Sequence, residues 1–224
     1  MSFSTGSLNL DRILGGGFPK GGISVITGPT GAGRTQLALA ASAAAVQADA
    51  SVAFYDFEGG VTPDRIQMFG LGLDAHAAFA YHAPTTLDQV RSLNLRAHPQ
   101  LMVIEGPNLT PSFADPASNR SEFAAFLQRL GRSLRPTTAV LITYQRKRSR
   151  WSLPLGLDHA ANTIVGLSVS NGQTTAEVTK SHNGRGRMGK CLFTFGDGCI
   201  HDFKLDPIVD RNTFADRFNR EDPL

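Results

Sequence analysis

The chain has only two cysteines, Cys191 and Cys199, and they do not form a CxxC pair. This scarcity argues against a zinc or redox site and favours reduced thiols in a cytosolic protein. Long apolar runs are also lacking, since the longest apolar-looking segment, Leu37 to Val46, is too short to cross a bilayer. The N-terminus has no basic segment followed by an apolar run, so we expect no signal peptide, no membrane partner and a cytoplasmic location.

A strong excess of one charge is missing too. The 22 Lys and Arg residues against 19 Asp and Glu residues leave a formal net charge of +3. The field of the whole protein therefore does not indicate nucleic acid, and only local clustering of basic residues can make that case. With 224 residues, 41% of them hydrophobic, the chain is long enough for one α/β domain with a sizeable core.

What the chain does have is a glycine-rich stretch between an apolar β-type run, Ile23 to Thr27, and a helix of good formers, Gln36 to Val46. Strand, glycine loop and helix in this order are the context in which a phosphate-binding loop works. The glycines let successive backbone N–H groups turn towards an anion, and the helix N-terminus adds a positive dipole end. The nucleotide-binding candidates of this loop are Gly28, Pro29, Thr30, Gly31, Ala32, Gly33, Arg34 and Thr35.

One position departs from the pattern G-x-x-x-x-G-K-[ST], because Arg34 stands in place of the lysine. Arginine keeps the positive charge, but a planar fork replaces a compact and flexible ammonium group. Thr35 places a hydroxyl where a nucleotide-bound Mg²⁺ needs a ligand. The loop therefore predicts a nucleotide site with Mg²⁺, and the alternative is a glycine-rich turn that binds nothing.

Strands and helices alternate along most of the chain, which predicts a mostly parallel sheet covered on both faces. Near the C-terminal end, the turn sequences Asn171-Gly172 and Gly196-Asp197-Gly198 predict two hairpins, so the sheet should finish antiparallel. A short helix capped by Ser7 should precede the first strand. The other expected helices are 35–46, 63–69, 87–96 and 118–134, and the expected strands are 23–27, 52–56, 79–82, 101–105, 139–144, 163–170, 174–180, 190–195 and 199–203.

Five segments, in order and spacing, resemble the RecA/RadA family of strand-exchange ATPases across nearly the whole chain. They are Ser4 to Gly21, Phe54 to Arg65, Leu101 to Glu105, Ile142 to Arg146 and Lys180 to Gly184. The second segment is especially similar to the archaeal and eukaryotic branch and to short RadB-like paralogues. The resemblance implies an α/β fold with a RecA-like P-loop core, in which a mostly parallel central sheet is flanked by helices and ends in antiparallel C-terminal hairpins. We expect this core over residues 1–205, without extra domains, and a C-terminal tail over residues 206–224.

The resemblance also implies roles for single residues. Glu58 would polarise the attacking water, and a carboxylate at the end of a central parallel strand does face the ligand crevice. Arg65 would stack on adenine, and Glu105 would hold Mg²⁺ through water in place of the family's aspartate. Gln145 resembles the relay between the γ-phosphate of ATP and a DNA-binding loop. The alternatives are a capping or solvated acid for Glu58, an exposed helix arginine for Arg65 and an ordinary strand-end residue for Gln145.

The family's basic intersubunit segment keeps Lys180, whereas its second basic position is His182. Arg185 and Arg187 lie close by in the sequence and could reach across instead. A cation supplied by a neighbouring protomer stabilises charge that develops on the γ-phosphate, so this change affects rate more than binding. Together with Arg34 in the loop, and with Glu105, which is longer than the family's aspartate, this change predicts slow turnover with nucleotide binding retained.

The clearest indication of nucleic-acid binding lies in the residues directly after Gln145, where the family has its second DNA-binding loop. Four cations in five positions supply phosphate contacts, and the only tryptophan offers a stacking surface. The segment up to Leu157 is shorter than in full recombinases, and a solvated basic turn is the alternative interpretation. The DNA-binding candidates are Arg146, Lys147, Arg148, Arg150 and Trp151.

We therefore expect an ATP-dependent protein that binds single-stranded DNA in homologous recombination or DNA repair, with slow, DNA-stimulated ATP hydrolysis and self-association into a filament or ring. One alternative is a catalytically degenerate, nucleotide-binding paralogue or accessory subunit of a recombinase partner. The other is a ring helicase of the DnaB kind, which shares this core. The tail is either a docked or frayed terminus or a partner-binding helix. The catalytic candidates are Glu58, Arg34, Gln145 and Lys180.

Overall fold

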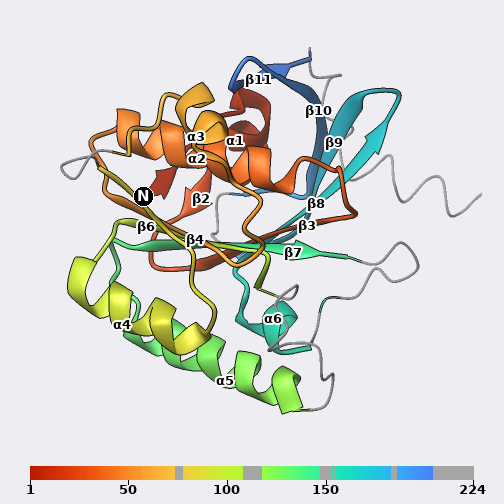
Figure 1. Cartoon of the computed structure of the whole chain (residues 1–224). Coiled ribbons are helices and arrows are strands. Elements are labelled where there is room, and N and C mark those ends of the chain that lie inside the picture. The colour runs from red at the N-terminus through yellow and green to blue at the C-terminus, as the bar shows by residue number, and fades with distance from the viewer. Residues whose placement is uncertain (74–77, 108–117, 147–152, 154, 183–185, 204–224) are drawn as a thin grey trace, which may run out of the picture.

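The structure is a computed structural model, and it describes residues 1–73, 78–107, 118–146, 153, 155–182 and 186–203. Within these residues the fold is α/β, as expected. A nine-stranded sheet with the order β11-β10-β9-β8-β3-β7-β6-β4-β5 lies between two layers of helices (Figure 1). The candidate tail, 206–224, lies outside the described residues, so the expected division of the chain stays a prediction.

The parallel part of the sheet is built around β3 (Ile23–Gly28), which pairs with both β7 and β8. On the other side of β7 lies β6, followed by β4, and β5 forms the edge. Helices cover both faces of the central strands, which explains why β3, β4, β6 and β7 are buried along nearly their whole length. The bounds are β4 Val52–Asp56, β5 Phe79–His82, β6 Leu101–Glu105, β7 Ala139–Gln145 and β8 Thr163–Ser170.

The sheet finishes antiparallel, as the turn sequences predicted. β8 and β9 (Gln173–Ser181) pair across Asn171 and Gly172, whose φ angles of 51° and 74° suit a tight hairpin turn. A second hairpin joins β10 (Gly189–Gly196) to β11 (Cys199–Asp202), and β10 also pairs with β9. The C-terminal strands therefore extend the central sheet on the β8 side.

The helices form two layers, and local signals fix where several of them begin. The hydroxyl of Ser7 accepts a hydrogen bond from the amide of Leu10, and Thr62 caps its helix just before Pro63. In Figure 1, α1, α2 and α3 cover one face of the sheet, and α4 and α5 cover the other. The bounds are α1 Leu8–Leu14, α2 Arg34–Gln47, α3 Pro63–Met68, α4 Leu87–Ala97, α5 Ser118–Ser133 and α6 Leu155–Ala160.

Side chains alternate along each strand between two cores, one on each side of the sheet. In β4, Val52 and Phe54 face the α2 side, whereas Ala53 and Tyr55 face the side of α4 and α5. Continuing this alternation places the last residue of β4, Asp56, on the α2 side. The α2 side at the carboxyl ends of the strands is therefore where polar strand-end residues gather.

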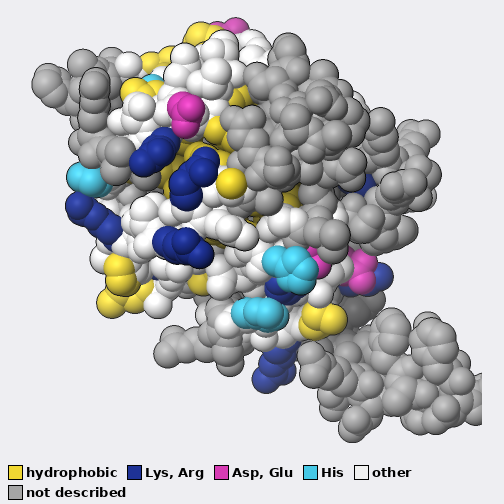
Figure 2. All heavy atoms as spheres, turned by 90° about the horizontal axis from the view of Figure 1, so that it is seen from below, with side chains coloured by type: hydrophobic (Ala, Val, Ile, Leu, Met, Phe, Trp, Pro, Cys, Tyr) yellow, Lys and Arg dark blue, Asp and Glu magenta, His cyan; other side chains and the backbone are white. Residues whose placement is uncertain are grey.

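The outer surface of α4 and α5 is basic and lies across the sheet from α2. Figure 2 shows Lys and Arg side chains around hydrophobic ones on this face. A hollow of about 270 Å³ lies between the two helices. Its lining includes Val90, Met102, Phe126 and Leu130, together with Arg91, Arg129 and Arg132.

Two features of the described chain were not predicted from the sequence. Residues Ser2–Phe3 (β1) and Phe18–Pro19 (β2) form a separate two-stranded sheet, and α6 follows the basic segment. Strands of two residues and a helix of six residues are too short to show a periodic pattern. None of the helices in the described part of the chain is both long and apolar enough to cross a bilayer.

Candidate functional site

The glycine-rich loop joins β3 to α2, as the sequence predicted. Gly33 precedes the helix with a φ of 87°, and no side chain caps the first turn. A side chain at this position would overlap the ring of Phe195 from β10, so only glycine lets the loop pack this closely. The N-terminus of a 14-residue helix is therefore presented without a side-chain cap, which is the arrangement that attracts an anion.

Arg34 is the first residue of α2, and its side chain is only 7% exposed. Its Nη2 atom donates a hydrogen bond to Oε1 of Gln145 at 3.3 Å and lies 3.9 Å from Oε1 of Glu58. Among the described residues, its Nη1 atom has no hydrogen-bond partner. Burial lowers the pKa of Arg34, and the nearby carboxylates of Glu58 and Glu105 oppose that shift. A buried guanidinium with an unsatisfied donor is costly unless an anion binds to it.

Glu58 follows β4 and lies over the backbone beyond β6. A side chain at Gly106, whose φ is 59°, would overlap Cγ of Glu58. The amide of Gly106 donates to Oγ1 of Thr143 at 2.9 Å, which fixes this close approach. Burial raises the pKa of Glu58, the charge of Arg34 lowers it and the charge of Asp56 raises it. The carboxylate is thus held near the guanidinium of the loop.

Glu105 ends β6 and is 1% exposed. Its Oε1 atom accepts a hydrogen bond of 2.6 Å from the hydroxyl of Thr35, and its Oε2 atom has no partner in the described part of the chain. Burial raises the pKa of Glu105 to about 7, against smaller opposing effects that include hydrogen bonds from Thr35 and Thr143. A hydroxyl beside a carboxylate supplies the oxygen ligands that Mg²⁺ prefers, so these residues fit the expected ion.

Five sequence-predicted residues therefore meet at one end of the sheet. Gln145 and Glu105 come from neighbouring strands β7 and β6, which places them beside the loop after β3. Ligands of open α/β sheets bind at this carboxyl edge. The amide of Arg146 also donates to the carbonyl of Gly28 at 3.0 Å, so the first basic residue lies directly beside the loop. The five residues are Arg34, Thr35, Glu58, Glu105 and Gln145.

Other predicted residues make contacts elsewhere. Nη1 of Arg65 donates to the carbonyl of Gly60 at 3.1 Å, and Nζ of Lys180 donates to that of Asp158 at 2.6 Å. His182 and Arg187 are exposed, and their amides bond to the carbonyls of Asn162 and Ile13. These contacts do not involve the glycine-rich loop, and the roles expected for these residues stay predictions. Lys147, Arg148, Arg150, Trp151 and Arg185 lie outside the described residues.

Sequence reasoning overlooked Asp56 and its partner Tyr81. Asp56 is 2% exposed, and the Tyr81 hydroxyl lies 3.0 Å from its Oδ2 atom. The alternation of side chains along a strand could have indicated Asp56. Like Glu105, it is the last residue of an apolar strand, and both residues lie on the same face of the sheet. In the sheet they are register partners. The sequence shows each carboxylate at a strand end, but it does not show that the two strands are neighbours.

Comparison with known proteins agrees with the resemblance. Residues 1–90 match the family described as the RecA N-terminal domain. RecA proteins of Synechocystis sp. and Azospirillum lipoferum are 47% identical to the chain over 73 and 72 residues, which is 33% and 32% of this chain. These matches span only 21% and 20% of the length of those relatives.

A solved structure described as that of the RadB recombinase has the same fold. It is 23% identical to this chain with a TM-score of 0.73, and the match covers 90% of this chain and 100% of that one. At this identity the likeness is one of fold. The expected RecA-like arrangement, with a mostly parallel sheet, flanking helices and antiparallel C-terminal strands, is therefore confirmed.

Proposed function

We propose that this chain, whose residues 1–90 match the RecA N-terminal domain family, binds ATP with Mg²⁺ and uses the bound nucleotide to control binding of single-stranded DNA in recombination or repair. One observation carries the proposal. Two buried side-chain atoms, the donor Nη1 of Arg34 and the acceptor Oε2 of Glu105, have no partner among the described residues. A nucleotide phosphate would satisfy the first atom and a divalent cation the second, so a Mg²⁺–nucleotide complex satisfies both.

The loop residues divide the binding between them. The N-terminus of α2 and the guanidinium of Arg34 bind phosphate oxygens, and the Thr35 hydroxyl and the Glu105 carboxylate hold Mg²⁺ directly or through water. When bound, Mg²⁺ neutralises charge on the phosphates. Arg65 is proposed to stack on the adenine, since its guanidinium lies beside the loop that carries Glu58, where Nη1 donates to the carbonyl of Gly60.

Glu58 is proposed to orient and polarise the water that attacks the γ-phosphate. Its carboxylate lies 3.9 Å from the guanidinium of the loop. Arg34 contacts Glu58 and Gln145 at the same time, so its donors are divided among three acceptors once phosphate is bound. Slow hydrolysis follows from this arrangement, because the cation that should stabilise transition-state charge also holds the catalytic acid.

Two hydrogen bonds connect the nucleotide loop to the start of the basic segment. Arg34 donates to Gln145, and the next residue, Arg146, donates its amide to Gly28. We propose that a change at the phosphate alters the position of Gln145 and thereby the cations that follow it. The cations bind the DNA backbone, and Trp151 stacks on a base. Lys180, His182, Arg185 and Arg187 are proposed to contact the nucleotide of a neighbouring protomer.

The test is the affinity for a labelled single-stranded oligonucleotide, measured by fluorescence anisotropy without nucleotide, with ADP and with a non-hydrolysable ATP analogue, each with Mg²⁺. We expect the ATP analogue to tighten DNA binding by roughly tenfold over ADP, a coupling within the usual range for linked sites. Thr35→Val is the matched variant without the proposed Mg²⁺ ligand, because it keeps the shape of the side chain and removes the hydroxyl. Equal DNA affinity in all nucleotide states would contradict the proposal.

A second candidate function is that of an accessory paralogue that binds nucleotide and a recombinase but barely hydrolyses. The contacts of Arg34 favour it, because both of its acceptors are residues proposed to act in hydrolysis. Electron microscopy with ATP analogue and DNA separates the candidates. Open filaments support the recombinase-like protein and closed hexamers the ring helicase, whereas assembly only with added recombinase supports the accessory subunit.

A further inference from the structure

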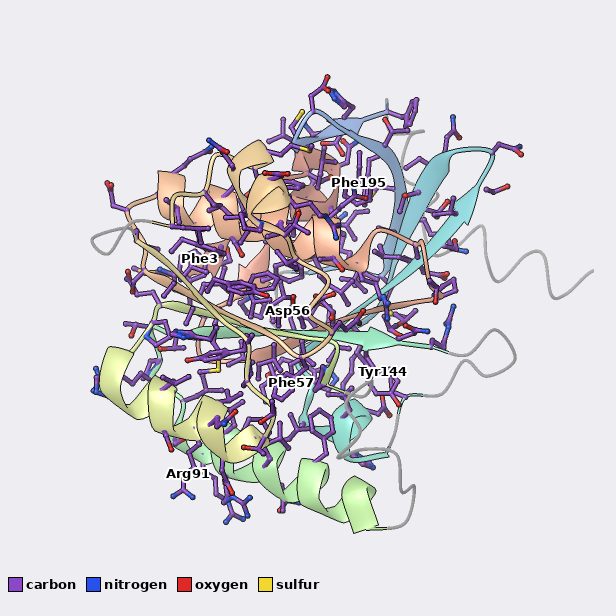
Figure 3. The ribbon with its side chains drawn as sticks, viewed as in Figure 1. Phe3, Asp56, Phe57, Arg91, Tyr144 and Phe195 are labelled. Carbon is purple, nitrogen blue, oxygen red and sulfur yellow. The ribbon has the colours of Figure 1, made fainter. Side chains whose placement is uncertain are left out.

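Asp56 is a buried carboxylate that is fully occupied by hydrogen-bond donors. Its Oδ1 atom accepts from the amides of Glu58 and Gly59, both at 2.9 Å. Its Oδ2 atom accepts from the amide of Val61 at 2.9 Å and from the hydroxyl of Tyr81 at 3.0 Å. In Figure 3, Asp56 and its chain neighbour Phe57 project to opposite sides of the sheet.

These contacts differ from those of an ordinary buried acid. Three of the four donors are backbone amides of the loop that directly follows Asp56, and that loop carries Glu58. Hydrogen bonds that a carboxylate accepts are about twice as strong as those between neutral groups. Their combined effect is to hold the backbone from Glu58 to Val61 in one conformation.

Tyr81 supplies the fourth donor from the edge strand β5. Burial, with the charge and hydrogen bond of Asp56, raises the pKa of Tyr81 to about 12, so the hydroxyl keeps its proton at neutral pH. The ring of Tyr81 is stacked on Phe54 with 6.5 Å between centroids, which fixes its direction. The edge strand is thereby tied to the loop that carries the candidate catalytic acid.

We propose that Asp56 and Tyr81 are positioning residues that hold Glu58 in place for attack on the nucleotide. They act through the backbone of the loop, and Gly106 leaves room for the Glu58 side chain beside Arg34. The catalytic consequence rests on the proposed ATP hydrolysis. Errors of about 1 Å in the position of a catalytic group can cost about 100-fold in rate, so a rigid loop matters even though Asp56 acts only through the backbone of that loop.

The chain offers a matched control for Tyr81→Phe. Tyr55 lies on β4 beside Asp56, is fully buried, and its hydroxyl has no hydrogen-bond partner among the described residues. Tyr55→Phe therefore removes the same atom without removing a contact. Asp56→Asn is the second test variant, because its amide keeps one acceptor and places an N–H₂ group against the donors of the loop.

The experiment combines three measurements on the full chain: amide hydrogen exchange at Glu58, Gly59 and Val61, the Kd for ATP, and the single-turnover rate of ATP hydrolysis. In Tyr81→Phe and Asp56→Asn we expect faster exchange at these amides, a Kd within about twofold, and a rate reduced about tenfold or more. In Tyr55→Phe all three quantities should match the wild type. A role limited to stability would not separate the rate from the Kd.

Unchanged exchange at the three amides would overturn the inference, and so would faster exchange with an unchanged rate in a wild type that turns over. A wild type with no turnover would instead overturn the proposed hydrolysis. In that case the exchange data alone decide whether Asp56 and Tyr81 hold the loop. The two failures are therefore distinguishable.

Discussion

Arg34 of the nucleotide loop and Gln145 of β7 are joined directly, with 3.3 Å between Nη2 and Oε1. The contact connects the loop directly to the strand that leads into the basic segment. A lysine at this position would present a compact ammonium on a flexible stem and could not span Gln145, Glu58 and a phosphate together. The arginine therefore couples three parts of the site that a lysine would leave separate.

Arg34→Lys is predicted to raise the rate of ATP hydrolysis by roughly tenfold, equivalent to about 1.4 kcal/mol in the barrier. The reason is that the ammonium would bind phosphate while releasing Glu58 and Gln145. Steady-state phosphate release at saturating ATP measures the effect. Arg34→Ala is the control for loss of charge and should weaken ATP binding. A lysine variant with a rate no higher than the wild type would show that the arginine does not limit turnover.

Gly106→Ala is predicted to reduce hydrolysis much more than ATP binding. The new Cβ atom would overlap the side chain of Glu58 at a φ of 59° and displace the carboxylate. Gly172→Ala is the matched control, since Gly172 has a φ of 74° and nothing within 4 Å of an added Cβ. Both variants carry the backbone strain, about 1 kcal/mol, but only the first should change kcat. Equal effects on kcat would contradict the placement of Glu58.

Glu105→Gln is predicted to change how stability depends on pH in the absence of nucleotide and Mg²⁺. Burial raises the pKa of Glu105 from its ordinary 4.5 to about 7. An acid with a raised pKa stabilises the folded state below its unfolded pKa, and this contribution is lost as pH rises through the folded value. Between about pH 4.5 and pH 8, the free energy of unfolding of the wild type should therefore fall by about 3 kcal/mol relative to that of the variant.

Urea unfolding of both proteins at the two pH values measures this difference. Glu177→Gln is the control, because Glu177 forms a more exposed ion pair with Lys190 at 3.3 Å. Such pairs contribute little, so the control difference should change by less than about 1 kcal/mol over the same range. A parallel pH dependence for wild type and Glu105→Gln would contradict the raised pKa.

Replacing three cations of the basic segment is predicted to lower the affinity for single-stranded DNA and to make that affinity less dependent on salt concentration. The variant is Lys147→Ala, Arg148→Ala and Arg150→Ala. Each neutralised phosphate contact contributes about 0.7 to the slope of log K against log salt, so the slope should fall by about 2. The charge-matched control replaces Arg91, Arg129 and Arg132 on the basic face of α4 and α5, across the sheet from α2. Equal losses in both variants would mean that DNA binding follows net charge alone.

Local signals in the sequence were sufficient to predict most of the fold. Ser7 before α1, Pro63 at the start of α3 and the Asn171-Gly172 turn act on neighbouring residues, so the structure confirms them at their predicted positions. The glycine-rich loop was predictable for the same reason, because its strand, turn and helix are contiguous in the chain. The stated bounds of the expected helices and strands differ from the observed ones by at most one residue at each end.

Contacts between distant segments were not predictable in this way. The hydrogen bond from Tyr81 to Asp56 depends on β5 lying beside β4, and that from Thr35 to Glu105 depends on α2 lying across β6. The order of strands in the sheet is set by packing of whole elements rather than by a short motif. The family resemblance implied a place beside the nucleotide loop for Glu105, whereas it gave no role to Asp56.

ATP hydrolysis measured with and without single-stranded DNA, over a range of salt, tests the central claim most directly. The proposed function predicts slow turnover that DNA stimulates, with the stimulation fading as salt rises and weakens the phosphate contacts. Fast turnover that is indifferent to DNA would contradict the coupling of Arg34 and Gln145 to the basic segment. Tight binding of ATP and DNA without any turnover would contradict the assignment of Glu58 and leave the accessory subunit as the function.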